Sequence, residues 1–597
     1  MDRFFLTMRQ LLAITLLAML SSSCGGGGGG GSGATMPPAP GPGPGTTENA
    51  SASCATSTGA GQNYLCSLRP IDASTRFSLQ GAPEGMAVHP RSGRLYWTPM
   101  PAQQGRSSVT IIRTSGARHL TEVFALDVGS GSPAANGIYI SPIGDDSQLG
   151  TAQAPLRTLA AAVSKAGPGD TLYLRGGDYY NDGFGTDFST RSRNNLARIT
   201  SSGTAGMKIT IRPHGNEYVR LISDVNGLAF RDARHWKLQN LELMGTAASL
   251  DVQDSLSLWW DQSDAQNQIQ GRGISLNSSY NIEISGCVIH HFPGAGVSNN
   301  GGAYITVADS VIYNNAWWST AGTHGFANSS PATEDNTETQ PFKVIMRGNL
   351  VFGNQSSMIS HVFSKGVVKL EIDEGNGLHM QNNGGNFFGR FLAEQNLSLL
   401  NGKAGLGLNT VDNSVIRNNA FYANAQAVVR SGELVLQSSS SQNISQNLFH
   451  ALPDRNTIRT SDTYAGVGSN YAVASADTAE LPASITQVSA VFADPANGDF
   501  SRSASVPAGN GPDDANVARF HQLISEQGLT LRAAPTAVTP AYLRQLRARI
   551  LQDWPAPDPQ DDIPENLILE DPDSGHCYRY ADRMDYPGPP SSGTVCR

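Results

Sequence analysis

One short phrase recurs along the middle of the chain: β-branched residues, a small polar residue, an asparagine, then more aliphatic residues. Matching positions lie 23 residues apart, as Ile282 and Ile305 do, and again Leu397 and Ala420. Apolar and polar residues alternate inside each copy, which indicates strands rather than helices. A repeat of this length means that each unit packs only on its two neighbours. The repeats therefore predict an all-β solenoid, a parallel β-helix.

The N-terminus has the pattern of an export signal. Arg3 and Arg9 precede an apolar core that is too short to span a membrane. Its end resembles a bacterial lipoprotein signal, which implies cleavage after residues 1–23 and lipid attachment at Cys24. Residues 24–53 are rich in Gly, Pro and Ser and predict a flexible tether.

The expected location is therefore the bacterial cell envelope. A lipid on Cys24 would anchor the protein in the outer membrane, either surface-exposed or on the periplasmic side. Ordinary secretion is the alternative interpretation of the same signal.

Cysteine positions and charge narrow the chemistry further. An exported chain permits two disulfides between near neighbours, Cys54 with Cys66 and Cys577 with Cys596. Cys287 falls at an inward position of a repeat, and we expect it to be buried and free. The formal net charge is −9 and no basic run is present, so nucleic acid is not an expected partner. A polyanionic glycan would need a local basic groove or a bridging cation.

Residues 54–130 predict a separate module. Short alternating strands separated by Gly and Pro turns are typical of a small β-sandwich. The segment Trp97-Thr98-Pro99, followed by Gln104 and Gly105, resembles the bacterial putative-Ig, cadherin-like repeat. Such modules are usually spacers, so this Ig-like sandwich is expected to be a stalk.

A capping helix is expected at the N-terminal end of the solenoid. Residues 155–166 form an amphipathic pattern through Leu156, Leu159 and Val163, and a helix there would cover the open edge strand. This stretch and the repeats after it resemble the pectate-lyase-like right-handed β-helix superfamily, closest to polysaccharide lyase family nine, over residues 136–515. The resemblance implies right-handed winding and a polysaccharide substrate. Residues 516–597 predict an irregular, partly helical extension, with helices near 515–527 and 540–552.

Three stretches depart from the repeat: 249–270, 316–342 and 356–391. Such departures build walls around an exposed sheet face, where solenoids place their function. The first two carry Trp259, Trp317 and Trp318, whose rings suit stacking on a sugar. Capping of the hydrophobic core under long loops explains them equally well.

The third departure holds an acidic turn, Glu371, Asp373 and Glu374, before Gly375. Carboxylates on a flexible turn suit Ca²⁺, although a solvated acidic turn is the simpler alternative. Lyases of family nine hold calcium at a turn that contains Asp-Asp-Gly. The resemblance therefore implies that Asp373 and Glu374, with Glu371, bind calcium.

β-Elimination from a uronate needs a base for the proton α to the carboxylate and a cation that neutralises the carboxylate. In the lyases that the chain resembles, a Lys one rung along is the base. Lys403 is the candidate here, and His379 is a second acid/base candidate. Arg390 or Arg417 could bind a carboxylate bidentately.

These observations favour a monomeric, surface-tethered polysaccharide lyase that acts on an acidic glycan. A glycoside hydrolase on the same fold would need facing aspartates, which the Asn- and Ser-rich repeats do not supply. A non-catalytic, adhesive β-helix that binds glycans is the third alternative, because a fold does not fix a function.

Overall fold

The protein is described from a computed structural model. The structure describes 49–185, 195–247, 270–319, 323–330, 342–356, 374–381, 390–426, 431–440, 442–453, 455–460, 468–473 and 485–526, and only the backbone of five further short strands. Cys24, the expected signal and residues 24–48 of the expected tether lie outside these residues. The end of the expected tether is part of the folded module: Ala50 is buried in its core, and Ser51 donates hydrogen bonds to Glu122, so the flexible segment does not extend to residue 53. Within the described part, no helix combines the length and the apolar character that crossing a membrane requires.

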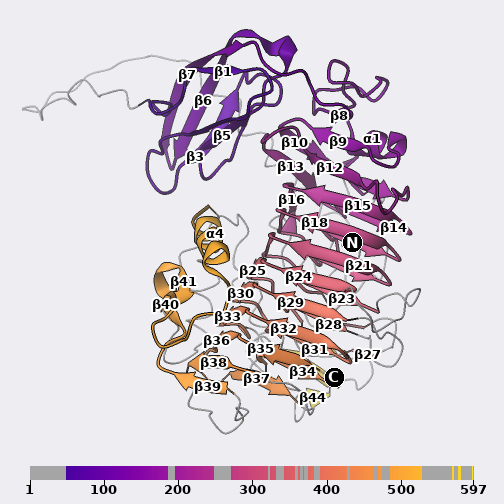
Figure 1. Ribbon diagram of the computed structural model, residues 1–597, viewed down its shortest axis with the longest axis vertical. Coiled ribbons are helices and arrows are strands. Elements are labelled where there is room, and N and C mark those ends of the chain that lie inside the picture. Colours follow the sequence, from indigo (N-terminus) through magenta and orange to yellow (C-terminus); the bar gives the residue numbers. More distant parts are fainter. Residues whose placement is uncertain are drawn as a thin grey trace, which may run out of the picture. The chain divides into compact units, whose positions relative to one another are not determined.

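Three parallel sheets wind into a right-handed β-helix (Figure 1). The ten-stranded sheet contains β8 (Ile138–Ile140), β9 (Thr171–Leu174), β12 (Ile209–Pro213), β15 (Arg234–Gln239), β18 (Tyr280–Ser285), β21 (Ala303–Ala308), β24 (Val344–Arg347), β29 (Phe391–Glu394), β32 (Ser414–Arg417) and β35 (Asn443–Ser445).

The eleven-stranded sheet follows it in each coil. It contains β10 (Gly177–Tyr180), β13 (Val219–Ser223), β16 (Glu242–Gly245), β19 (Val288–His290), β22 (Val311–Tyr313), β25 (Leu350–Phe352), β30 (Leu397–Leu399), β33 (Ala420–Tyr422), β36 (Leu448–His450), β38 (Asn470–Val473) and β39 (Ile485–Val488).

The nine-stranded sheet completes the coil. It contains β11 (Ala197–Ile199), β14 (Leu228–Arg231), β17 (Ile274–Asn277), β20 (Val297–Asn300), β23 (Phe326–Ser329), β28 (Leu378–Gln381), β31 (Ala404–Asn409), β34 (Gly432–Gln437) and β37 (Asn456–Thr460).

The repeat seen in the sequence is one coil of this helix. Ile282 pairs directly with Ile305 in the ten-stranded sheet, and Leu397 pairs with Ala420 in the eleven-stranded sheet. Inward-facing aliphatic and aromatic residues from all three sheets stack into one continuous core. Each side chain thus contacts its equivalents one coil above and below, which is why the periodic sequence specifies the register.

Buried asparagines line the same two turns of successive coils in the C-terminal half. We call the row between the ten- and eleven-stranded sheets ladder 1 and the row between the eleven- and nine-stranded sheets ladder 2. In each, the side-chain N–H₂ donates to the amide oxygen of the next asparagine at 2.9–3.1 Å, and the backbone N–H of the same residue donates to that oxygen as well. Ladder 1 comprises Asn349, Asn396, Asn419, Asn447 and Asn470, and ladder 2 comprises Asn315, Asn354, Asn401 and Asn424, ending on Glu433.

A short helix covers the N-terminal end of the core. Helix α1 (Leu159–Lys165) begins after Thr158, whose hydroxyl accepts a hydrogen bond from the Ala161 N–H at 3.1 Å. Leu159 and Val163 are buried against the first coil. The helix is shorter than the pattern over 155–166 predicts, because Leu156 is extended and pairs with Ile140.

The N-terminal module consists of two small sheets around a core that includes Trp97. One sheet orders β1 (Ser57–Gly59), β7 (Arg118–Gly129), β6 (Gly105–Ser115) and β3 (Arg76–Gln80), and the other β2 (Tyr64–Ser67), β5 (Arg94–Trp97) and β4 (Ala87–Val88), with a 3-10 turn η1 (Pro101–Gln103) before β6.

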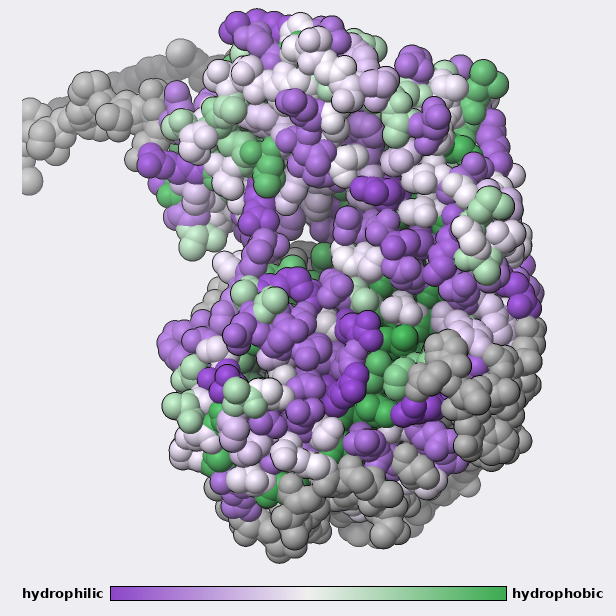
Figure 2. All heavy atoms as spheres, viewed as in Figure 1, coloured by the Kyte–Doolittle hydropathy of each residue, from purple (hydrophilic) through white to green (hydrophobic). Residues whose placement is uncertain are grey.

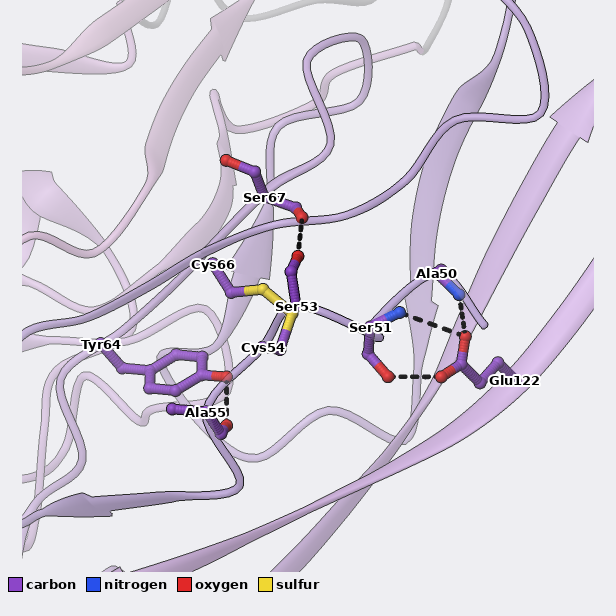
Figure 3. Close-up of a disulfide and its surroundings, with 9 residues drawn as sticks. All are labelled: Ala50, Ser51, Ser53, Cys54, Ala55, Tyr64, Cys66, Ser67 and Glu122. Carbon is purple, nitrogen blue, oxygen red and sulfur yellow. Dashed lines mark hydrogen bonds between the residues drawn. A yellow bond between two sulfur atoms is a disulfide. The ribbon is translucent and has the colours of Figure 1, made fainter. Parts of the chain in front are cut away.

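A disulfide joins Cys54 to Cys66 in this module (Figure 3). The Tyr64 hydroxyl donates to the Ala55 carbonyl at 2.7 Å beside it. Cys287 is free and fully buried, and burial raises the pKa of its thiol to about 12. The expected partnership of Cys577 with Cys596 lies outside the described side chains.

Removing this disulfide is expected to weaken the module. A double variant with Cys54→Ser and Cys66→Ser should unfold with about 3 kcal/mol less stability, because a short loop is no longer closed in the unfolded chain. Denaturant titration followed by total tryptophan fluorescence, to which Trp97 of this module contributes, measures the change, and Ser53→Ala, on the neighbouring surface, is the control. An unchanged unfolding midpoint for the double variant would contradict the expectation.

The C-terminal segment packs on the outer face of the eleven-stranded sheet. It comprises β40 (Phe492–Asp494), η5 (Pro495–Asn497), β41 (Asp499–Arg502) and α4 (Asp514–Glu526), and it buries Phe500, Phe520 and Ile524 against outward-facing residues such as Leu397 and Leu399. The helix agrees with the pattern near 515–527, and 540–552 lies outside the described residues. The covered part of this sheet is therefore an internal surface.

Candidate functional site

The outer faces of the other two sheets differ in character. On the ten-stranded sheet, Ile345, Leu392 and Val415 align in register, and Figure 2 shows hydrophobic residues gathered near the middle of this face. Beside them Glu394 bridges Arg347 at 2.5 Å and Arg417 at 2.7 Å. The charges described on this part of the face are thus already paired.

The nine-stranded sheet carries small and polar side chains outward. One row across β17, β20, β23, β28 and β31 runs in register through Ser275, Ser298, Ala327, His379 and Gly407. The neighbouring inward positions are core residues such as Leu378 and Met380, which fixes the outward direction of His379 by strand alternation. His379 is thus surrounded by residues that are smaller than itself.

A glycine opens most strands of this sheet. A side chain on Gly325 would lie 2.5 Å from the carbonyl oxygen of Gly377, so the close approach of successive coils requires glycine there. The residue before each glycine then forms a second row, one position per coil. It reads Arg272, Ala295, His324, Asn376 and Ala404. This row, which we call the entry row, brings together residues from insertions of different length.

His324, Asn376 and His379 form one hydrogen-bonded cluster. The backbone N–H of Asn376 donates to His324 Nδ1 at 3.2 Å, so the proton of a neutral His324 is on Nε2. The side-chain N–H₂ of Asn376 lies 3.2 Å from the Nδ1 atoms of both histidines and donates to both. His379 Nε2 is 3.2 Å from Gln381 Oε1, to which it donates. Both imidazoles are therefore held with the proton on Nε2.

Burial and charge keep the two imidazoles neutral. Burial, and after it the positive charge of Lys403, lowers the pKa of His379 from 6.5 to about 4. The pKa of His324 is well below its ordinary value, chiefly because of burial and then because of His379 and Lys403. The ring centres lie 4.0 Å apart, so two imidazolium charges would repel strongly at this distance.

Glu374 and Lys403 flank this cluster. Glu374 Oε2 lies 3.4 Å from His324 Nε2, and the carboxylate is 17% exposed. The half-buried Lys403 directly precedes β31, at the position of the next coil that corresponds to Gly375. Its backbone N–H donates to the Gly375 carbonyl at 3.1 Å. The buried Asn376 Oδ1 has no hydrogen-bond partner. It would lie 3.0 Å from a side chain on Gly407, as would His379 Nδ1, so that glycine leaves space beside both polar atoms.

The structure places several expected site residues elsewhere. Trp317 and Trp318 are each 1% exposed, and their indole N–H groups donate to the Gly353 and Ala247 carbonyls at 3.1 and 2.7 Å. This corrects the sugar-stacking interpretation: both rings belong to the interior. Trp259 lies outside the described residues.

One candidate arginine, Arg417, ends β32 of the ten-stranded sheet, and the other, Arg390, directly precedes β29 of the same sheet. Arg417 is paired with Glu394, and Arg390 lies over the ring of Phe342 at 4.6 Å. Neither is on the face that carries His379. This corrects the expectation that they join Lys403 in binding a carboxylate.

The expected calcium ligands give an incomplete donor set. Glu371 and Asp373 lie outside the described residues, and Glu374 faces an imidazole. Among the side chains that the structure does describe, no three His, Cys, Asp or Glu converge as a metal site. The described side chains alone therefore do not fit a calcium site.

Three members of the cluster carry no individual sequence signal. His324 and Asn376 are 52 residues apart, and only the recurrence of a glycine after each of them relates the two positions. Gln381 follows His379 by strand alternation. The Gly-apolar phrase at the start of each nine-stranded-sheet strand could have aligned the entry row.

Comparison with known proteins agrees with this architecture. The family described as "Pel9A-like, right handed beta helix region" matches residues 138–443. Pectate lyase PEL9 of Emericella nidulans is 29% identical over 165 residues, which cover 25% of this chain and 37% of that protein. The uncharacterized protein YwoF of Bacillus subtilis is 37% identical over 82 residues, 14% of each chain. The chain therefore spans well under half of the length of these relatives.

Two solved structures show a weak similarity to the chain. A glycoside hydrolase is 9% identical, with 64% of this chain and 98% of that chain covered and a TM-score of 0.39. A rhamnogalacturonan lyase is 15% identical, with 57% and 73% covered and a TM-score of 0.31. Neither likeness adds to the chemistry of the site.

Proposed function

Because the chain belongs to the Pel9A-like right-handed β-helix family, we propose that it is a polysaccharide lyase that cleaves a uronate-containing glycan by β-elimination. The observation that carries the proposal is the convergence of Lys403, His324 and His379 on one polar face of the nine-stranded sheet. That pectate lyase PEL9 is among the relatives supports an acidic substrate. Lipid anchoring at Cys24 and display on the cell envelope belong to the same proposal.

Lys403 is the proposed base. His379 is the weaker candidate, because its Nδ1 accepts from Asn376 and its Nε2 already carries the proton. Neither ring nitrogen can take a proton without breaking that network. The same tautomer makes His379 a neutral N–H donor, suited to a substrate carboxylate that replaces Gln381 Oε1 as acceptor.

The proposed reaction is a single elimination step. Lys403 in its neutral form removes the proton on the carbon next to the uronate carboxylate. The released electron pair forms a double bond to the neighbouring ring carbon, and the bond from that carbon to the glycosidic oxygen breaks. Solvent protonates the leaving oxygen. The N–H groups of His379 and Asn376 stabilise the charge that develops on the carboxylate.

A product assay tests the proposal directly. Incubation with polygalacturonate, polymannuronate and polyguluronate is expected to produce unsaturated ends, which are measured as ultraviolet absorbance. The same assay with and without a chelator tests whether the activity depends on calcium. Lys403→Ala should lower the rate by about 10²–10⁴-fold, the usual contribution of a positioned base, and leave oligosaccharide binding intact. Lys237→Ala, a lysine paired with Glu283 on the ten-stranded sheet, is the matched control.

The outcomes separate the candidate functions. Binding without any product from the native protein would replace the lyase by the adhesive, glycan-binding alternative. Full activity of Lys403→Ala would show that this lysine is not the base. If His379→Ala is inactive while Lys403→Ala remains active, His379 would be assigned as the base instead.

A further inference from the structure

The entry row continues beyond the histidine cluster to an arginine. Arg272 precedes Gly273 as His324 precedes Gly325, and only Ala295 separates the two positions. The Gly227 N–H donates to the Arg272 carbonyl at 2.9 Å, and the Gly273 N–H to the Ala295 carbonyl at 3.0 Å, which fixes the alignment of these coils. Arg272 therefore lies two coils from His324, about 10 Å along the sheet.

The guanidinium of Arg272 reaches the outer face of this sheet. Its terminal nitrogen donates to the hydroxyl of Ser298 at 3.4 Å, and Ser298 belongs to the same outward row as His379. Between Ser298 and His379 this row holds only Ala327. Small side chains thus connect the arginine to the histidine cluster along both rows.

Among the described residues Arg272 has no acidic partner, unlike two other arginines of the solenoid. Arg175 lies 3.0 Å from Glu217, and Arg220 lies 2.6 Å from Asp178. In the described part of the chain no carboxylate forms an ion pair with Arg272. Burial lowers the pKa of its half-buried guanidinium, and no carboxylate offsets that effect. A partly desolvated cation with five N–H donors and a single hydroxyl contact favours binding of an anion.

We propose that Arg272 forms a subsite that binds the carboxylate of an acidic sugar, next to the sugar that reacts at Lys403 and His379. The subsite rests on the proposed function and specifies it: the substrate is anionic at two positions, not only at the one that is cleaved. A guanidinium recognises a carboxylate bidentately, so the subsite distinguishes a uronate from a neutral sugar of the same shape.

Equilibrium binding tests this inference without turnover. The Lys403→Ala protein is titrated with tetragalacturonate and with its carboxyl-reduced counterpart, and Arg272→Gln is added to the same background. Arg272→Gln is expected to weaken binding of the acidic ligand by about 10–100-fold and to leave the affinity for the reduced ligand unchanged. Arg459→Gln, an exposed arginine on β37 at the far end of the sheet, is the control and should change neither affinity.

A second variant tests the subsite if Arg272→Gln does not fold. Ser298→Asp places a carboxylate at the position that Arg272 contacts, and it should remove the preference for the acidic ligand in the same way. If Lys403→Ala binds none of the acidic oligomers, the proposed function is wrong. Should it bind tetragalacturonate while Arg272→Gln or Ser298→Asp retains the full acidic preference, the subsite alone is overturned.

Discussion

Replacing Asn401 by alanine is expected to cost roughly 4 kcal/mol of folding free energy, although the residue touches no candidate site residue through its amide. The side chain is fully buried in ladder 2. It accepts hydrogen bonds from the backbone and side-chain N–H groups of Asn354, both at 3.1 Å. It also donates to Asn424 Oδ1 at 2.9 Å and to Ser398 Oγ at 3.1 Å.

The size of the effect follows from what remains after the substitution. Alanine leaves the donors of Asn354 and the acceptor of Asn424 buried, and each buried group that loses its partner costs about 1–3 kcal/mol. Water has little room to replace the amide, because the ladder lies between packed coils. Asn443→Ala removes an exposed asparagine from the last strand of the ten-stranded sheet and should change the stability by no more than about 0.5 kcal/mol.

Denaturant unfolding followed by far-ultraviolet circular dichroism measures both variants. The midpoint and slope are compared separately, because coils of a solenoid can unfold in more than one step. If Asn401→Ala and Asn443→Ala unfold at the same denaturant concentration as the native protein, the ladder does not stabilise the coils as described.

The register of the solenoid could be predicted because one physical rule repeats. Each coil must present an aliphatic residue at the same inward position and an asparagine at the same turn. The spacing between Ile282 and Ile305 is therefore enough to predict that they pair. The sequence shows the asparagines equally well. It does not show that one buried side-chain amide forms hydrogen bonds with groups of its own coil and of the next coil.

The candidate site was harder to predict because a β-helix has three outer faces. Arg417 and His379 both follow from strand alternation as outward-facing, but one is on the ten-stranded sheet and the other on the nine-stranded sheet. Lys403 and His379 were predicted as separate acid/base candidates, and the charge of Lys403 lowers the pKa of His379, as expected for neighbours on adjacent coils. His324 was missed because its distance from Asn376 depends on the length of an insertion.

The sequence left two interpretations of the aromatic residues in insertions open, and the burial of Trp317 and Trp318 supports core capping over sugar stacking. An exposed tryptophan that stacks on a sugar and a buried one that closes the core have the same sequence signature. The difference lies in the indole N–H: Trp317 and Trp318 donate to backbone carbonyls of other coils, which ties both rings to the interior.

The last prediction concerns the residue on which ladder 2 ends. Glu433 is fully buried, and it accepts hydrogen bonds from the backbone N–H of Asn424 at 2.9 Å and from its side-chain N–H₂ at 2.5 Å. Burial raises the pKa of this carboxyl from 4.5 to about 8, despite the opposing effect of the two hydrogen bonds. The native protein therefore retains at neutral pH a proton that the unfolded chain releases.

The direction of the pH dependence follows from this difference. Because the folded pKa lies above the unfolded one, the contribution of Glu433 to stability is complete below pH 4.5 and declines as the pH rises to about 8. The expected slope over this interval is about 1.4 kcal/mol per pH unit, which makes the total loss several kcal/mol. Above the folded pKa the native state holds a buried anion and loses no further stability from this group.

Glu433→Gln removes the titration while preserving the shape of the side chain. The variant itself loses one accepted hydrogen bond, because its amide N–H₂ faces a donor of Asn424, so its stability at pH 5 should be lower than that of the native protein. The difference should shrink or reverse by pH 9, where the native protein has lost the contribution of the protonated carboxyl.

Unfolding free energies at pH 5, 7 and 9 measure this change, with Glu283→Gln, on the outer face of the ten-stranded sheet, as control. A difference between Glu433→Gln and the native protein that stays constant across this range would show that the carboxyl does not titrate with a raised pKa. The physical reason to expect the change is the position of Glu433. The last acceptor of a chain of amide donors needs oxygen atoms, and where no described cation pairs with it the buried carboxyl provides them at least cost when protonated.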